Sequence, residues 1–231
     1  MLNEIGWNAK PGDSDDVKSV RATIIRALGY HGRDPEVLRR VAELAQQYRK
    51  DPTSVDPNLG GLAVELAALN GDAKLYDEYA LRMSQAKTPQ ELYTYMEALT
   101  HFPQPDLAQR TLDMMMSPEI KAQDMFRGFF GLLDNPETRD LAWAYFKSHW
   151  AETQKKVGAS LGFGFGGLAS LFCSEQAKQD VQQWFTQHPD PGGPRALRQG
   201  LERLDTCVRI RNTQGPNLAS WLREHAGAAA Q

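Results

Sequence analysis

The chain of 231 residues lacks several features that define common protein classes. No uninterrupted apolar stretch approaches the ~20 residues that a helix needs to cross a bilayer, so the sequence predicts no membrane span. Acidic and basic residues number 29 and 26, respectively, and the two signs are interspersed along the chain. Because phosphate binding depends on concentrated positive charge, we expect no nucleic-acid partner.

Residues that bind metals or form disulfides are scarce. There are only two cysteines, Cys173 and Cys207, each within an amphipathic segment. We interpret both as buried free thiols, with a disulfide or a redox pair as the alternative. The histidines stand tens of residues apart, and no His-Glu-x-x-His motif, which zincins use to hold zinc and activate water, is present. We therefore expect no metal, no cofactor and no catalysis in this chain alone.

Apolar residues recur at helical spacing along most of the sequence, and turn-forming residues separate the runs. Thr88, Pro89 and Glu91 provide an N-cap, a first helical residue and a capping box. Ser117 and Pro118 predict a helix start of the same kind. No run alternates with the period of a strand. Helices are predicted over residues 15–28, 35–48, 59–69, 74–84, 89–101, 107–116, 119–133, 137–156, 176–187, 195–211 and 217–225.

Helix pairs therefore recur at about 30–40 residues, which is typical of helical repeats. We predict an all-α fold, a HEAT-like or armadillo-like α-solenoid of antiparallel helix pairs. Residues 1–14 are interpreted as a linker from a preceding domain, residues 15–225 as the helical-repeat domain, and residues 226–231 as a frayed tail. The first residues show no signal-peptide pattern. The chain is either cytoplasmic or an internal piece with an added start residue, and we favour the second interpretation.

The most distinctive stretch covers residues 123–150, two amphipathic helices joined at a corner that contains Asn135 and Pro136. It resembles the signature of the ERAP1-like C-terminal domain of M1-family zinc aminopeptidases, of the puromycin-sensitive or aminopeptidase N type. The segment GWNAKPGD at residues 6–13 is similar to the opening of that region, and the last helices are similar to its end. The resemblance is weakest in the last dozen residues. The matching residues are Asp124, Asn135, Arg139, Trp143, Phe146 (displaced by one place), Lys147 and Trp150.

The resemblance implies a non-catalytic domain that caps the active-site chamber of an aminopeptidase and helps to select and bind peptides. Zinc would belong to the absent catalytic domain, which would be a partner of this chain together with peptide substrates. Basic groups bind the peptide C-terminus in some family members, and Arg127, Lys155 and Lys156 are our candidates for this role. We interpret the signature residues as structural.

The alternative is a free-standing HEAT-like scaffold that binds a protein partner on its concave face. An apolar patch exposed at the N-terminal end would indicate a severed domain interface, whereas polar helices at both ends would favour the scaffold. We expect a cytoplasmic location, and the possibility of a signal peptide or membrane anchor in the parent protein stays open.

Overall fold

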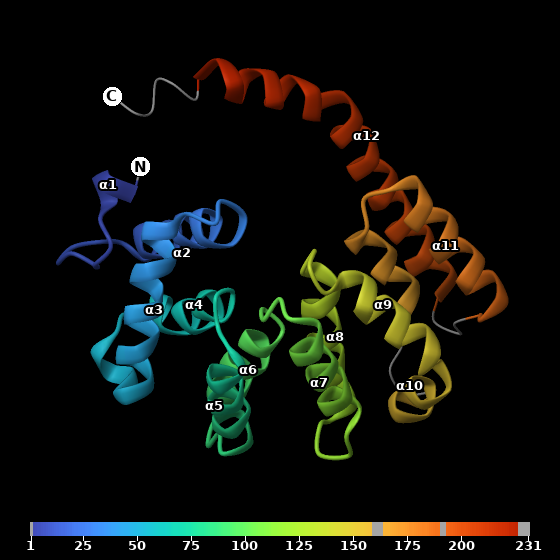
Figure 1. The fold of residues 1–231 in the computed structure, drawn as a ribbon, viewed down its shortest axis with the longest axis horizontal. Helices are drawn as coiled ribbons and strands as arrows, with labels where there is room; N and C mark the ends of the chain where they lie inside the picture. The colour runs from blue at the N-terminus through green and yellow to red at the C-terminus, as the bar shows by residue number, and fades with distance from the viewer. Residues whose placement is uncertain (1, 159–163, 190–192, 226–231) are drawn as a thin grey trace. The chain divides into compact units, whose positions relative to one another are not determined.

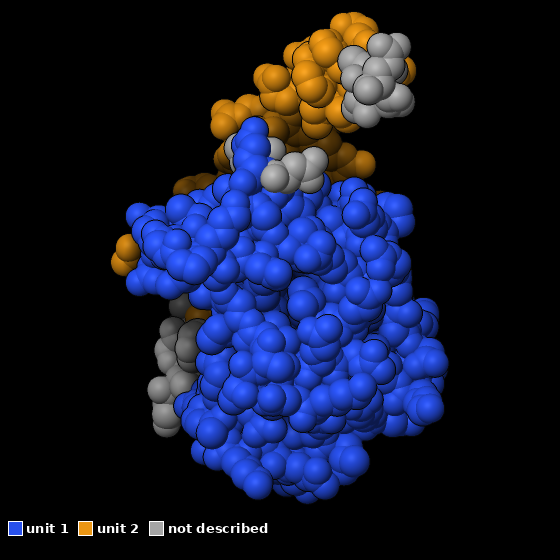
Figure 2. All heavy atoms as spheres, turned by 90° about the vertical axis from the view of Figure 1, so that its left-hand side faces the viewer, with its two compact units in different colours: residues 1–156 blue, residues 157–231 orange. Residues whose placement is uncertain are grey.

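The computed structural model describes residues 2–158, 164–189 and 193–225, and every regular element in these ranges is helical (Figure 1). There are twelve α-helices and no strand among the described residues, which confirms the all-α prediction. The chain divides into two compact units, residues 1–156 and residues 157–231, which Figure 2 distinguishes by colour. Within the described ranges, no helix combines the length and the apolar character required to cross a membrane.

The predicted linker, residues 1–14, contains one short helix, α1 (Leu2–Ile5), which contacts α2 (Asp15–Arg26). Arg21 of α2 is buried and holds this segment in place. Its guanidinium donates to the Gly6 carbonyl over 3.0 Å and forms an ion pair with Asp13. A buried charge is tolerated when it is paired and hydrogen-bonded in this way. The segment is therefore attached to α2 through its backbone as well as through a side chain.

The other helices of residues 1–156 follow one another with short connections. Neighbours pack in pairs, α3 with α4, α5 with α6 and α7 with α8, and helices α2, α4, α6 and α8 also contact one another in that order. We call these four helices the even-numbered ladder. The elements are η1 (Ala27–His31), α3 (Pro35–Lys50), η2 (Pro52–Ser54), α4 (Pro57–Ala68), α5 (Ala73–Ser84), α6 (Pro89–Leu99), α7 (Pro105–Met116), α8 (Ala122–Asp134), α9 (Arg139–Ser148) and α10 (Trp150–Val157).

Several predicted helix starts are confirmed by their capping hydrogen bonds. The Glu91 amide donates to Thr88 Oγ1 over 3.2 Å, and the Glu91 carboxylate accepts from the Lys87 amide over 3.0 Å. Asp34 and Asp72 likewise cap α3 and α5. Each of these side chains satisfies amides that have no partner within the first helical turn.

The predicted helix start at Ser117 and Pro118 is wrong, because α8 begins at Ala122. Residues 117–121 form a turn in which the Ser117 carbonyl accepts from the Ile120 amide over 3.3 Å. The same carbonyl accepts from Lys156 Nζ. These contacts hold Ser117 as the end of one helix rather than as the cap of the next.

The first long helix was expected to stop at Gly29, but it continues as the wider turn η1 and ends at Gly32. Gly29 lies so close to α4 that a Cβ atom there would come within 2.9 Å of Leu66 Cδ1. The glycine therefore permits close helix packing rather than ending the helix. Arg33, which follows, has φ of 47° and turns the chain into α3.

Residues 157–231 contain η3 (Phe165–Leu171), α11 (Glu175–Gln187) and α12 (Gly193–His225), and α12 packs against both other elements. The backbones of η3 and α12 approach closely at two glycines. A Cβ atom on Gly200 would lie 2.7 Å from the Gly166 carbonyl oxygen. The absence of side chains at these positions therefore allows η3 to lie directly against α12.

The prediction of free thiols is wrong, because Cys173 and Cys207 form a disulfide. Their Cα atoms lie 5.4 Å apart although the residues are separated by 34 positions. The close packing of η3 on α12 brings the segment that follows η3 beside the middle of α12. Arg211 strengthens this contact by donating to the Cys173 carbonyl over 3.2 Å.

The predicted break between Arg211 and Asn217 is absent, because α12 continues through Pro216. Proline removes the amide that would donate to the carbonyl four residues earlier, that of Asn212. This part of α12 is exposed, so water can satisfy that carbonyl. Asn217 Nδ2 donates to the Thr213 carbonyl over 3.3 Å and supports the same turn. The predicted frayed tail, residues 226–231, lies outside the described residues.

Candidate functional site

A groove of about 980 Å³ follows the even-numbered ladder. Its floor includes apolar and small residues of α4, and its polar side chains come from all four helices of the ladder. The charged and aromatic residues on which its chemistry depends are Arg26 of α2, Glu65 of α4, Tyr93 and Glu97 of α6, and Arg127 of α8.

The four charged side chains of this groove form two ion pairs. Arg26 Nη2 lies 2.8 Å from Glu65 Oε2, and Arg127 pairs with Glu97. The Arg26 and Arg127 side chains are 48% and 47% exposed, whereas that of Glu65 is 8% exposed. Both guanidiniums therefore remain accessible to a ligand, and Glu65 is largely shielded from water, whereas the Glu97 side chain is 35% exposed.

Burial raises the pKa of the Glu65 carboxyl above its usual range. The Arg26 guanidinium opposes this shift, while the charge of Glu97 adds to it. Removal from water disfavours the charged form of an acid, and a second carboxylate nearby has the same effect. Burial and the nearby negative charge therefore favour the neutral form of Glu65.

Arg127, the predicted peptide-binding residue of α8, lines this groove and is held by an aromatic ring. Its guanidinium lies over the Tyr93 ring at 4.5 Å from the centroid, a distance at which a cation is attracted to the ring face. The Tyr93 hydroxyl donates to Asp124 Oδ1 over 3.0 Å, and this hydrogen bond raises the pKa of Tyr93. Asp124, the first signature residue, thus orients Tyr93, and Tyr93 in turn positions Arg127.

The other two predicted peptide-binding residues do not line this groove. Lys155 is exposed on α10. Lys156 donates to the Ser117 carbonyl, and burial lowers the pKa of its ammonium group. The structure therefore does not bring Arg127, Lys155 and Lys156 together at the groove of the even-numbered ladder.

Asn135 and Arg139 hold the corner between α8 and α9 through the backbone. Asn135 Oδ1 accepts from the Glu137 amide over 3.0 Å, and its Nδ2 donates to the Thr100 carbonyl over 3.2 Å. Arg139 Nε donates to the Leu133 carbonyl over 2.7 Å. Both side chains therefore bond backbone groups at the corner, including a carbonyl at the end of α8 that lacks a helical partner.

The aromatic signature residues pack on one another beneath this corner. Trp143 stacks on Phe146 with ring centroids 5.4 Å apart, and Phe146 meets Trp150 edge to face at 5.3 Å. Phe129 of α8 contacts Phe146 from the facing helix at 6.2 Å. All four side chains are buried, so these residues lie inside the fold rather than along the groove.

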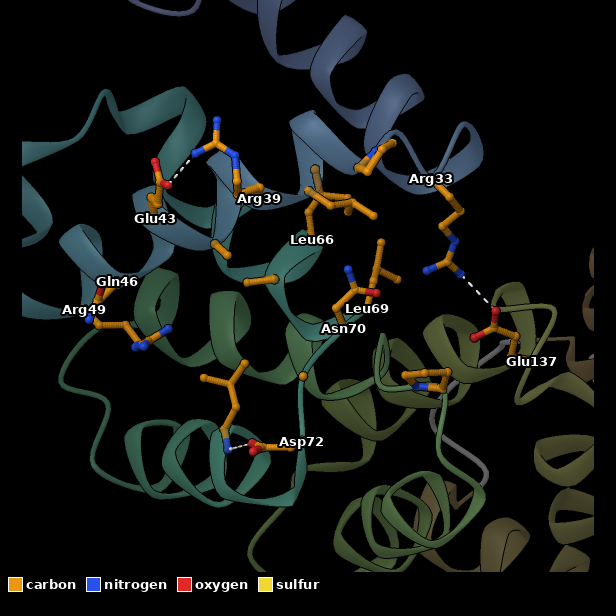
Figure 3. Close-up of a pocket in the computed structure, with 17 residues that line it drawn as sticks. Arg33, Arg39, Glu43, Gln46, Arg49, Leu66, Leu69, Asn70, Asp72 and Glu137 are labelled. Carbon is orange, nitrogen blue, oxygen red and sulfur yellow. Dashed lines mark hydrogen bonds and ion pairs between the residues drawn. The ribbon is translucent and has the colours of Figure 1, made fainter.

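A second groove, of about 1010 Å³, lies along α3 and the connection between α4 and α5 (Figure 3). Its charged side chains are already paired: Arg33 lies 3.2 Å from Glu137, and Arg39 lies 2.6 Å from Glu43. Figure 3 shows Leu66 between these two pairs. Neither pair contains a buried acid comparable to Glu65, so this groove offers no proton-binding centre of that kind.

The described part of the chain contains no group of three or more His, Cys, Asp or Glu residues arranged to hold a metal ion. The zinc that the family resemblance implies therefore has no ligand set among these residues.

Sequence reasoning missed Arg26, Glu65, Tyr93 and Glu97 as parts of the groove. One signal was available, because Glu65 is the only charged residue of the apolar helix α4. A charged residue in such a helix is rarely buried without a partner. The identity of its partners depends on helix packing, which the sequence pattern does not specify.

The fold and the groove define an all-helical protein with a charged groove and no metal centre among its described residues. The sequence profile of the ERAP1-like C-terminal domain matches residues 1–206. The chain belongs to this family.

Three similar proteins are aminopeptidases. Aminopeptidase M1 from Arabidopsis thaliana is 24% identical over 212 residues, which cover 87% of this chain and 23% of that protein. Alanine/arginine aminopeptidase from Saccharomyces cerevisiae is 24% identical over 236 residues, which cover 97% of this chain and 26% of that protein. Aminopeptidase M1-B from Oryza sativa subsp. japonica is 26% identical over 230 residues, which cover 95% of this chain and 26% of that protein. The chain thus spans about a quarter of the length of these relatives.

Proposed function

We propose that this chain is the non-catalytic C-terminal domain of an M1-type zinc aminopeptidase. In this role it caps the active-site chamber and helps to select peptides, while the rest of the enzyme removes their N-terminal residues with zinc. The observation that carries the proposal is that a chain of this family has a charged groove in which the guanidiniums of Arg26 and Arg127 are about half exposed. The catalytic part of the same polypeptide is the proposed partner.

We further propose that residues 1–156 form a HEAT-like or armadillo-like solenoid. The support is the order of contacts, in which each helix packs on its neighbour and the members of the even-numbered ladder pack on one another. Repeats of this kind present extended binding surfaces along one side. The even-numbered ladder would then be the side that faces the peptide.

Within this groove, Arg127 and Arg26 are the proposed partners of a peptide carboxylate. A guanidinium can donate two parallel hydrogen bonds to a carboxylate, which gives orientation as well as affinity. Tyr93 holds Arg127 in place before a ligand arrives. Lys155 is exposed and is retained as a second candidate contact for longer peptides. Retaining the C-terminal end of a peptide selects among lengths without any chemical role for this domain.

Replacing Arg127 by glutamine is expected to weaken binding of an N-acetylated peptide with a free C-terminal carboxylate by about tenfold or more, because hydrogen bonds to charged groups contribute about 1.5–3 kcal/mol. The measurement is titration calorimetry on the chain. The C-terminal amide of the same peptide should bind weakly to both proteins. Arg39→Gln is the matched control, since Arg39 is also exposed and paired but lines the second groove. Equal losses in R127Q and R39Q would reject the groove as the peptide site.

One observation favours the alternative, a free-standing scaffold that binds a protein partner. A severed domain interface predicts a contiguous apolar patch at the N-terminal end, yet Val20 is the only large apolar side chain described as exposed among residues 2–50. The second half of α12 carries more of them, namely Ile210, Leu218, Trp221 and Leu222. The scaffold predicts tight binding of a folded partner protein and no effect on aminopeptidase activity.

A further inference from the structure

We propose that the second half of α12, residues 209–225, is the surface by which this chain docks on the catalytic part of the same enzyme. This inference rests on the proposed function, because the catalytic part is the partner proposed there. It goes beyond that function by naming the contact surface and the chemistry of the surface that receives it. The receiving surface would be an apolar groove with carboxylates along its rim.

The second half of α12 carries an exposed apolar stripe. Its large apolar side chains, each more than half exposed, are Ile210, Leu218, Trp221 and Leu222. Leu218, Trp221 and Leu222 stand at positions i, i+3 and i+4, and so share one side of the helix. Ile210 lies about three turns before Trp221 and falls on the same side. With this spacing an amphipathic helix inserts its anchor residues into a groove of a partner protein.

The stripe continues the side of α12 that is packed within its own unit. Gly200, Leu204 and Val208 in the first half are buried, and α12 contacts both η3 and α11. Alternating steps of four and three residues lead from Leu204 through Val208 to Leu218 and Leu222, so these residues follow one face. No described residue of α12 after Val208 is buried, and Figure 1 shows α12 continuing past α11. The apolar patch that a severed domain interface predicts would therefore lie on α12 rather than at the N-terminal end.

The composition of this half of the helix indicates that it needs a packing partner. Gly215 and Pro216 are adjacent in it, and glycine and proline are the two residues least favourable to a helix. A short helix gains most of its stability from packing of its apolar face. Contact with the catalytic part would supply the packing that residues 209–225 lack in the chain alone.

The charges beside the stripe distinguish between two possible partners. Residues 209–225 contain one acid, Glu224, and three exposed arginines, Arg209, Arg211 and Arg223. An interface between identical copies must be complementary to itself, and two copies of this helix would bring predominantly positive surfaces together. Carboxylates on the catalytic part would complement the arginines. Charge therefore favours the catalytic part over a second copy of the chain.

The test compares amide hydrogen exchange in the chain alone and in the full-length enzyme. Residues 209–225 should exchange about tenfold or more slowly in the full-length enzyme, because burial of the stripe opposes local opening of this helix. Equal exchange of these residues in the two proteins would overturn the inference.

Two substitutions in the stripe test whether its side chains cause the protection. Leu218→Ala combined with Trp221→Ala should restore fast exchange of residues 209–225 in the full-length enzyme, because two central anchors are lost. Alanine is favourable to a helix, so exchange in the isolated chain should not change. Leu81→Ala is the matched control, since Leu81 is also more than half exposed but lies on α5. It should leave the protection intact, and protection that survives the double variant would overturn the inference.

Sedimentation and vesicle binding of the isolated chain address the other occupants of the stripe. We expect a monomer that does not bind vesicles of phosphatidylcholine and phosphatidylglycerol. Self-association or vesicle binding that is lost in the double variant would overturn the inference in favour of a second copy or a lipid surface.

The proposed function has a separate readout in the peptide binding that Arg127 controls. Peptide binding that depends on Arg127, found together with unprotected residues 209–225, would overturn this inference and leave the proposed function intact. Protection that depends on the stripe, found together with peptide binding that ignores Arg127, would support docking and reject the groove as the peptide site.

Discussion

Replacing Phe146 by alanine is expected to lower the free energy of unfolding by about 3–5 kcal/mol, the usual cost of removing a buried phenylalanine side chain. Phe146 is 1% exposed and lies among the rings of Phe129, Trp143 and Trp150. These rings join α8 to α9 and α10, so the cavity would weaken the corner that the signature residues build. Equilibrium denaturation monitored by tryptophan fluorescence and circular dichroism measures the change.

Phe130 provides the matched control on α8, because its side chain is 41% exposed. Its replacement by alanine should cost about 1 kcal/mol or less, as is usual for surface positions. Similar losses in the two variants would contradict the structural interpretation of the signature. So would an F146A variant that keeps its stability but loses peptide binding.

Removing the disulfide by replacing both Cys173 and Cys207 with serine is expected to cost about 2–4 kcal/mol. The bond closes a loop between residues 34 positions apart and so restricts the unfolded chain. It also fixes the end of η3 to α12, and the loss should be concentrated in residues 157–231. The change in the free energy of unfolding of that unit is measured by denaturation, with amide hydrogen exchange as the local probe.

Reduction supplies the control for this prediction. Dithiothreitol should lower the stability of the unmodified chain to about that of the double serine variant, and it should leave the variant unchanged. Identical unfolding of the unmodified chain with and without reductant would show that the link between η3 and α12 contributes nothing to stability.

Local sequence signals predicted much of the helical structure. The caps at Asp34, Asp72 and Thr88 act within a few residues of their own helices, so their chemistry can be read from the sequence. Ser117 presents similar residues, but its carbonyl bonds to Lys156, 39 positions away. A signal that depends on such a distant contact cannot be recognised from a local pattern.

The disulfide and the groove were not predicted from the sequence, because both depend on tertiary packing. Cys173 and Cys207 meet because two glycines allow η3 to approach α12 closely, and no local pattern encodes that pairing. Arg127 was identified as a candidate, yet its ion-pair partner Glu97 lies 30 positions away on another helix. The groove therefore depends on how the helices of the even-numbered ladder pack together. Most residues of the family signature lie instead at the corner between α8 and α9.

The function proposed for this chain is the selection of peptides for an aminopeptidase, without catalysis by the chain itself. The most direct measurement is zinc content and peptide hydrolysis by the chain alone, and after mixing with a separately made zinc-bearing portion of the same enzyme. We expect no bound zinc and no turnover alone, and a changed preference for peptide length on mixing that is lost with R127Q. Stoichiometric zinc together with turnover by the isolated chain would contradict the account.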